Sequence, residues 1–411
     1  MKFNKLRYIA PTGTVIKFKE LLSFMVDSIR SCDKRQSLSD AIKQKYNVRY
    51  CYLMSSGRAA MAILFKLISL NNKDVKRTEI VMPSYTCYSV PAAAQIAGLT
   101  VRICDINPET LSYDRQQFES IDFSKVLCIT TASLYGYPDD LEYIESIAKK
   151  NNCYLLDDSA QSMNAKIGNR YSGSFGDIGI YSLDKGKNIT SLQGGIIVTN
   201  NDTLNELIEN ELKELPSPGI FSIFSDILKL SIYSLLINPA LYWMPARAPF
   251  LGLGKTIYTT DYLYSKYSKH LSNLSYALFN RIDEITEDRK SKYLKIYNAL
   301  KENRNIKFLS KIDDNTQPAF LRTIIFIKDT DTRDNIIRDL NENGIGATAS
   351  YPKSIANLDE VKTFSIIHNN ISSGGQYVAE HILTLPNITF LSDPDVKKIK
   401  NIINTHTDYA H

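Results

Sequence analysis

Two residues, Lys187 and Asp158, have types and positions that suit chemistry on one bound cofactor. Lys187 lies in a polar loop between the apolar runs 178–181 and 196–198, which are typical of buried strands. A lysine held at the end of a strand, inside a folded core, loses part of its hydration, and its amine becomes a better nucleophile. The chain has 49 Lys and Arg residues, however, and a solvated loop lysine is the commoner case, so Lys187 needs support from elsewhere.

Asp158 supplies that support. Residues 153–161, CYLLDDSAQ, run from an apolar stretch directly into Asp157 and Asp158. An acid that follows a hydrophobic strand lies at the carboxyl end of a sheet, where open α/β folds bind ligands. Pyridoxal phosphate needs a carboxylate against its ring nitrogen and a lysine at its aldehyde, and Asp158 and Lys187 fit as that pair. Either aspartate also fits as the N-cap of a following helix, which is the commoner role for such an acid standing alone.

The pair Ser56-Gly57 follows the first strand-like run and opens a helical pattern. A helix N-terminus with a glycine offers free backbone N–H groups and a partial positive charge, which suits a phosphate. A plain N-cap followed by a tight turn explains an isolated Ser-Gly pair as well.

Strands alternating with helices must position these residues. Because this alternation is typical of a mostly parallel sheet covered on both faces, we predict an α/β fold. The candidate residues then share the edge formed by the carboxyl ends of the strands. The strand-like runs are 51–54, 79–82, 101–104, 126–131, 153–156, 178–182 and 195–199, and helical patterns cover 18–29, 59–68, 90–97 and 141–150.

Blocks of sequence along most of the chain resemble the DegT/DnrJ/EryC1/StrS family of sugar aminotransferases. Any one block is a weak signal, but six in register are a strong one. The C-terminal third adds 343–346 and 383–386, and the resemblance is absent from about 213–260. The six blocks are 56–60, 83–86, 134–136, 157–161, 173–177 and 182–195.

The resemblance implies fold type I, with a seven-stranded main sheet and a smaller C-terminal α/β domain. It also implies pyridoxal 5'-phosphate as cofactor and a homodimer. The implied activity is transfer of an amino group, from an amino-acid donor such as glutamate, to a nucleotide-linked keto sugar for surface polysaccharide biosynthesis. Members that remove a hydroxyl group typically have histidine at the lysine position, and Lys187 argues against that route. The alternative is a cofactor-binding or membrane-surface-associated member without transaminase turnover.

The resemblance also assigns roles to single residues. Lys187 becomes the catalytic lysine, and the other residues bind the cofactor. Asp158 faces the ring nitrogen, and Gln161 approaches the phenolic oxygen. The phosphate is held by Ser56, Gly57, Arg58 and Ser182, with Arg58 at a position where the family usually has threonine. Cys87 takes the place of an aromatic residue that stacks on the ring, unless Tyr88 takes over that contact.

Composition argues against several other functions. Hydrophobic residues make up 44% of the chain and charged residues 23%, as in ordinary globular proteins. The net charge of +5 includes no basic run, so we expect no nucleic-acid partner. The five histidines have no HxxH spacing, which predicts no metal site. The six cysteines form no CxxC pair and no signal peptide is visible, so we expect a cytoplasmic protein with reduced thiols.

We predict three parts: a cofactor-binding domain (1–212), an apolar insertion (213–260), and a connecting helix over 271–300 with a small C-terminal domain (261–411). In the insertion, Asp226 and Lys229 interrupt the apolar residues, which disfavours a membrane span. Three alternatives stay open for its helical part. It is buried on the core or at a dimer interface, it contacts the inner membrane face through 219–253, or it forms a lid over a bulky substrate.

One family segment differs in a way that affects the site. Just before the connecting helix the family typically has Asn-Tyr-Arg, which reaches the site of a neighbouring subunit. We place the equivalent residues here at Ser268, Lys269 and His270, so this chain would lack the contacts that the family shares between subunits.

Overall fold

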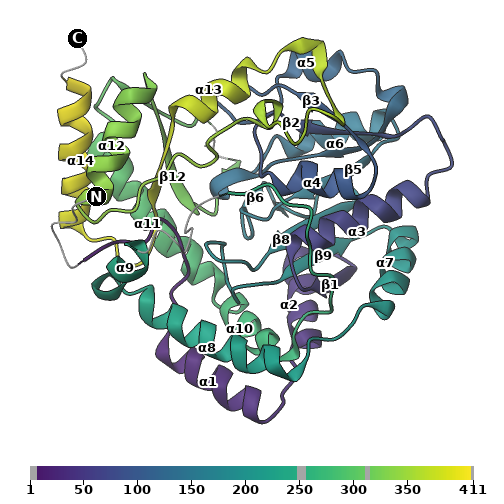
Figure 1. Cartoon of the computed structure of the whole chain (residues 1–411), viewed down its shortest axis with the longest axis horizontal. Helices are drawn as coiled ribbons and strands as arrows, with labels where there is room; N and C mark the ends of the chain where they lie inside the picture. The colour runs from purple at the N-terminus through teal and green to yellow at the C-terminus, as the bar shows by residue number, and fades with distance from the viewer. Residues whose placement is uncertain (1–6, 248–255, 311–314, 409–411) are drawn as a thin grey trace.

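The seven predicted strands all form, and they lie in one eight-stranded sheet of the computed structural model, which describes residues 7–247, 256–310 and 315–408 (Figure 1). Every strand runs in the same direction except β9, which is antiparallel to both of its neighbours. The prediction of a mostly parallel sheet is therefore confirmed. In spatial order the strands are β1 (Tyr50–Met54), β9 (Gly195–Thr199), β8 (Ile178–Ser182), β5 (Tyr154–Asp158), β4 (Val126–Thr130), β2 (Glu79–Pro83), β3 (Thr100–Cys104) and β13 (Ser365–Ile367).

The large sheet directs alternate side chains into two helical layers. In β2, Ile80 and Met82 pack in the same apolar cluster as α3 and α4, whereas Val81 packs in the cluster that contains α5 and α6. This alternation follows from the two-residue period of a strand, and it explains why β2 is buried along its whole length. The helices of these layers are α3 (Gly57–Leu70), α4 (Ser89–Ile96), α5 (Arg115–Glu119), α6 (Leu141–Lys150) and α7 (Asp202–Glu214).

The C-terminal third forms a second, antiparallel sheet of three strands, β10 (Ile306–Phe308), β12 (Arg322–Ile327) and β14 (Ile382–Pro386). It also sends β13 to the edge of the large sheet, where β13 pairs in parallel with β3. The short strand β11 (Thr316–Gln317) joins β6 (Lys166–Ile167) and β7 (Arg170–Tyr171) in a third sheet. The helices of this part are α12 (Thr330–Glu342), α13 (Ser373–His381) and α14 (Asp393–Asp408).

The predicted single helix over 271–300 is two helices, α10 (Lys269–Phe279) and α11 (Ile282–Leu300), so that prediction is wrong at the break. The chain turns at Arg281, whose guanidinium donates to both carboxylate oxygens of Glu20, at 2.7 and 3.0 Å, and to the Val15 carbonyl. The turn lets α10 pack on α1 (Phe18–Ile29) and α2 (Arg35–Tyr46) while α11 packs on β12 and α14. Apolar periodicity continues on both sides of the break and therefore hides it in the sequence.

The insertion contains two helices, α8 (Ile220–Leu236) and α9 (Pro239–Ala246). Leu230 and Ile237 are buried, so one side of α8 packs on the protein as the first alternative expected. Within the described chain no single helix has the length and apolarity to cross a membrane, whereas 221–236 and 239–246 meet those limits together as a pair bent by 114°. Residues 248–253 of the predicted membrane contact lie outside the described residues.

Replacing Arg281 with methionine tests the turn between α10 and α11. The change leaves the buried Glu20 carboxylate without its cation. We therefore expect the free energy of unfolding to fall by about 3–5 kcal/mol. The matched control is Lys17→Met, which breaks an exposed pair with Glu284 and should cost about 1 kcal/mol or less. Urea unfolding of both variants measures this, and equal losses would contradict the account.

Candidate active site

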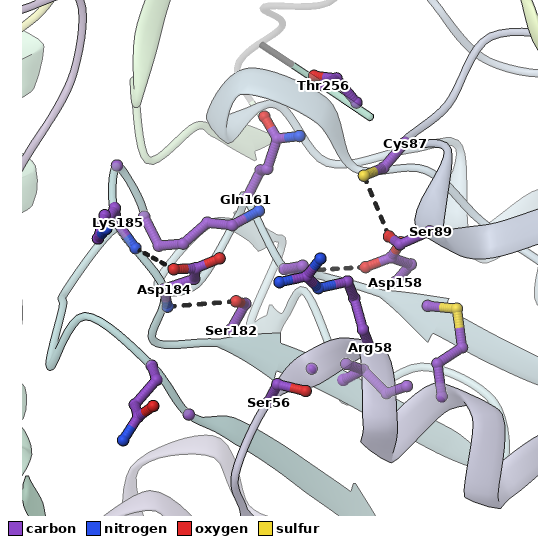
Figure 2. A pocket seen from close by; sticks show the side chains of 18 of the residues that line it. Ser56, Arg58, Cys87, Ser89, Asp158, Gln161, Ser182, Asp184, Lys185 and Thr256 are labelled. Atoms are coloured by element: carbon purple, nitrogen blue, oxygen red, sulfur yellow. Dashed lines mark hydrogen bonds between the residues drawn. The ribbon is translucent and has the colours of Figure 1, made fainter. Parts of the chain in front are cut away.

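All eight sequence-predicted site residues line one pocket of about 700 Å³ at the carboxyl edge of the large sheet. The ends of β1, β5 and β8 supply most of them, as expected for parallel strands whose carboxyl ends meet at one edge. Figure 2 shows Arg58 extending from α3 toward Ser182 and Asp158, with Cys87 and Gln161 on the opposite side of the pocket. The eight residues are Ser56, Gly57, Arg58, Cys87, Asp158, Gln161, Ser182 and Lys187.

The start of α3 is held close to β8 and β9. The Ser56 hydroxyl accepts the Ala59 N–H at 3.1 Å and caps the helix, so the alternative role of an N-cap is real. A Cβ placed on Gly195 would lie 2.4 Å from the carbonyl carbon of Ser56, and one on Gly57 would touch Ser182 at 3.4 Å. Only glycine, which has no Cβ, lets position 195 of β9 lie this close to the start of α3. The free N–H groups of the helix start, the Ser182 hydroxyl and the Arg58 guanidinium consequently converge on one wall.

The two neighbouring acids face opposite ways, as the two-residue period of a strand requires. Asp158 lines the pocket and accepts the Ala160 N–H at 3.1 Å. Burial raises the pKa of its carboxyl, while that hydrogen bond and the charge of Lys187 pull the pKa down. Asp157 lies beneath the pocket and accepts the Ser159 hydroxyl at 2.8 Å and the Gly173 N–H at 2.6 Å. Asp157 therefore braces a loop, and Asp158 is the acid available to a ligand.

The loop that carries Lys187 is clamped from two distant parts of the chain. The Thr14 hydroxyl donates to the carbonyls of Lys187 and Asn188, at 3.1 and 3.0 Å. Arg289 of α11 donates to the same two carbonyls, at 3.3 and 3.1 Å, and burial lowers the pKa of its guanidinium to about 10. Four hydrogen bonds thus fix the backbone around Lys187, while its side chain faces the pocket that Asp158 lines.

The opposite wall contains Gln161 and Cys87. The Gln161 carbonyl oxygen accepts the Tyr135 N–H at 3.1 Å, and its amide donates to the Tyr351 hydroxyl at 2.7 Å. Its expected contact with a cofactor oxygen stays a prediction. Cys87 lines the pocket, whereas Tyr88 does not, because its hydroxyl is turned to the backbone of Lys353. The geometry therefore favours Cys87 over Tyr88 at this place.

Sequence reasoning missed Arg322, which lines the pocket from the start of β12. Its guanidinium donates to the hydroxyls of Thr348 and Thr384, at 2.8 and 3.0 Å. Burial lowers the pKa of this group, and no carboxylate pairs with it in the part of the chain that the structure describes. The sequence around Arg322 does not mark it as a site residue among the many Lys and Arg of the chain. It reaches the pocket only because of the way β12 packs.

Ser268, Lys269 and His270, where we expected the sequence to differ from the Asn-Tyr-Arg of the family, lie at the start of α10. None of the three lines the pocket. The nearby wall comes instead from the same chain, at 256–263. Tyr262 anchors this segment by donating to the Ser89 carbonyl at 3.2 Å, and its ring lies 6.0 Å from the Arg58 guanidinium. Sequence reasoning did not identify this wall, since it has no regular secondary structure.

Known proteins resemble the chain over most of its length. The profile of the DegT/DnrJ/EryC1/StrS aminotransferase family matches residues 20–220 and 265–404. The GDP-perosamine synthase of Escherichia coli O157:H7 is 29% identical over 191 residues, which are 46% of this chain and 51% of that protein. The GDP-4-keto-6-deoxy-D-mannose 3-dehydratase of Yersinia pseudotuberculosis is 26% identical over 165 residues, 40% of this chain and 42% of that protein. The chain thus spans about half the length of these curated relatives, or less.

Solved structures extend the likeness to the whole fold. The E. coli GDP-4-keto-6-deoxy-D-mannose-3-dehydratase with bound hydrated PLP superposes with a TM-score of 0.77 at 16% identity, covering 97% of this chain and 100% of that one. PseC of Helicobacter pylori, an aminotransferase involved in the biosynthesis of pseudoaminic acid, gives 0.77 at 15% identity, covering 98% and 100%. These structures confirm the expected fold type I architecture.

Exchanging each acid for its amide separates the roles of Asp157 and Asp158. Asp157→Asn should lower the free energy of unfolding by about 1–3 kcal/mol, because Oδ2 accepts from the Gly173 and Phe175 N–H groups while Oδ1 accepts from the Ser159 and Thr131 hydroxyls, and an amide has an acceptor oxygen on one side only. Asp158→Asn should change it by about 1 kcal/mol or less, since this side chain opens onto the pocket. Urea unfolding measures both, and a larger loss for Asp158→Asn would refute the assignment.

Proposed function

The chain belongs to the DegT/DnrJ/EryC1/StrS aminotransferase family, and on that basis we propose that it is a pyridoxal-phosphate-dependent transaminase acting on a nucleotide-linked keto sugar. The observation that carries this proposal is the pocket in which the buried Asp158 has Lys187 as its cationic neighbour. Two relatives are named for reactions of GDP-linked sugars. One is GDP-perosamine synthase, and the other is a GDP-4-keto-6-deoxy-D-mannose 3-dehydratase. Lys187 favours amino transfer over removal of a hydroxyl.

The pocket residues fit the cofactor at each of its ends. A phosphate is matched by the α3 N-terminus, Ser182 and Arg58, a protonated ring nitrogen by the buried Asp158, and an aldehyde by the Lys187 amine. Pyridoxal phosphate, when bound, withdraws electrons from the carbon that carries the amino group. Cys87 would line one face of the ring.

The protein's own groups then have distinct tasks. We propose that the Lys187 Nζ takes a proton from the donor carbon and returns it during transfer, as a positioned general base and acid. Asp158 keeps the proton on the ring nitrogen, because an ionised carboxylate in a buried site stabilises a neighbouring positive charge. Thr14 and Arg289 hold the loop of Lys187 so that the amine stays within reach.

Arg322 is proposed to bind the carboxylate of the amino donor. It has no carboxylate partner among the described residues, and a partly buried cation without one favours an anionic ligand. Arg322 lies beside Tyr135 and Tyr351, which contact Gln161 at the inner wall. That position suits the small donor rather than the bulky nucleotide, and a guanidinium is the side chain best shaped to hold a carboxylate by two bonds.

For the wider setting we propose glutamate as the donor, surface polysaccharide biosynthesis as the pathway class, and a homodimer in the cytoplasm. We also propose that the protein lies at the inner face of a membrane, with the described part of the predicted contact, 219–247, toward the lipid. The apolar composition of α8 and α9 supports that contact.

The function is tested by incubating the protein with pyridoxal phosphate, glutamate and a panel of keto sugars linked to GDP, UDP or TDP. We expect one sugar to gain an amine while 2-oxoglutarate appears. Lys187→Ala should lower the rate by about 10²–10⁴-fold or more, because the proton-transferring amine is lost. The control Lys150→Ala removes an exposed amine that does not line the pocket and should keep most of the rate. A deoxygenated sugar without an amine would contradict the proposal.

Arg322→Met tests the donor subsite. Losing a charge-assisted hydrogen bond worth about 1.5–3 kcal/mol should raise KM for glutamate by about 10–150-fold and leave KM for the keto sugar nearly unchanged. Arg322→Lys keeps the charge and should show a smaller rise. Steady-state kinetics with each substrate varied in turn measures this. A rise in KM for the keto sugar alone would indicate that Arg322 binds the diphosphate of the nucleotide sugar instead.

A further inference from the structure

Two neighbouring helices, α1 and α8, expose stripes of large apolar side chains. In α1 the stripe has helical spacing and includes Phe18, 79% exposed, and Ile29, 83% exposed. In α8 the spacing is again helical, and Phe221 is 93% exposed. The outer face of α1 and α8, as we define it, consists of Phe18, Leu22, Val26, Ile29, Phe221, Phe224, Leu228, Ile232 and Leu235.

The two stripes point away from the same core. Leu21 and Phe24 of α1 and Leu230 of α8 belong to one buried cluster, so the inner sides of both helices converge on it. The helices contact each other and lie side by side along one edge of the molecule (Figure 1). The exposed stripes consequently form one continuous apolar surface. Soluble proteins rarely leave such a surface uncovered.

The polar groups of α8 are turned away from this surface or satisfied within the helix. Between 220 and 246 the charged residues are Asp226 and Lys229. Asp226 is buried, and Gln193 donates to its carboxylate at 3.3 Å. The hydroxyls of Ser222 and Ser231 donate to backbone carbonyls of their own helix. The outer side of α8 thus has apolar side chains and a single exposed cation.

Within α1, α8 and the residue after α1, the exposed charges are the cations Lys19, Arg30 and Lys229, whereas Glu20 is buried against Arg281, Asp226 is buried and Asp27 is half-buried. The exposed acids nearby, Glu284 and Asp33, are paired with Lys17 and Arg35. A second copy seated on this face would bring positive charges together, which disfavours association. An anionic surface offers the complementary sign, and basic amphipathic helices bind lipid headgroups in this way.

We propose that the outer face of α1 and α8 lies flat on an anionic membrane surface, with its apolar side chains inserted among the lipid headgroups. The helices run along the surface and do not cross it, since α8 has 17 residues and bends sharply into α9. The proposal does not depend on the transaminase function, but it rests on the membrane contact proposed above and deepens it. It adds α1 to the contact, and its docking residues lie on the side of α8 opposite Asp226 and its partner Gln193.

Vesicle flotation tests the docking of the full-length protein. We expect it to float with vesicles of phosphatidylcholine and phosphatidylglycerol, to float much less with phosphatidylcholine alone, and to be released in part by salt. The double variant Phe221→Glu/Leu228→Glu should lose flotation. The matched control Leu70→Glu/Val75→Glu changes two exposed apolar residues elsewhere on the molecule, 74% and 86% exposed, and should float like the parent protein.

Two further readouts keep the outcome unambiguous. Far-UV circular dichroism and amino-transfer rates of Phe221→Glu/Leu228→Glu in solution should match the parent protein, so that loss of flotation reports docking and not misfolding. Absence of flotation with both kinds of vesicle overturns the proposal. The proposal is also overturned if the parent protein does not float and light scattering shows that it is an oligomer which dissociates in this variant. The face would then be a contact between copies of the chain.

Discussion

The site depends on one electrostatic constraint, a carboxylate buried at the end of β5 with a lysine as its cationic neighbour. Burial raises the pKa of Asp158, and the charge of Lys187 opposes that rise. An acid that the protein keeps out of water in this way needs a positive partner to remain ionised. In the function that we propose, a protonated heterocycle would lie between Asp158 and Lys187 and meet that need, so the pair would fit pyridoxal phosphate better than either residue alone.

Much of the surrounding structure holds this pair in place. The parallel strands bring Asp158, Ser182 and the start of α3 to one edge, and the glycine at 195 allows α3 to approach β9. Thr14 and Arg289 come from distant parts of the chain and fix the carbonyls of Lys187 and Asn188. The same region is backed by α8, because Tyr233 donates to the Thr14 carbonyl. The insertion is therefore joined to the site through the clamp.

The sequence was informative where chemistry repeats at a fixed period or in a known order. Apolar runs located all seven strands of the predicted sheet, and six ordered blocks located seven of the eight predicted pocket residues, with Cys87 directly after the second block. It was uninformative where tertiary packing decides. Arg322 reaches the pocket only because β12 packs beside it, and the wall at 256–263 has no regular structure to detect. The break at Arg281 depends on Glu20, about 260 residues away in the chain. Composition showed that α8 is apolar, but only the fold shows which side it exposes.

Hydride trapping identifies the lysine that bonds to the cofactor aldehyde. The protein is saturated with pyridoxal phosphate, reduced with borohydride, digested and sequenced by tandem mass spectrometry. We expect a pyridoxyl group on the Nζ of Lys187, which fragmentation distinguishes from Lys185 in the same loop. A label on any other lysine, or unmodified Lys187 in protein that has bound the cofactor, would contradict it.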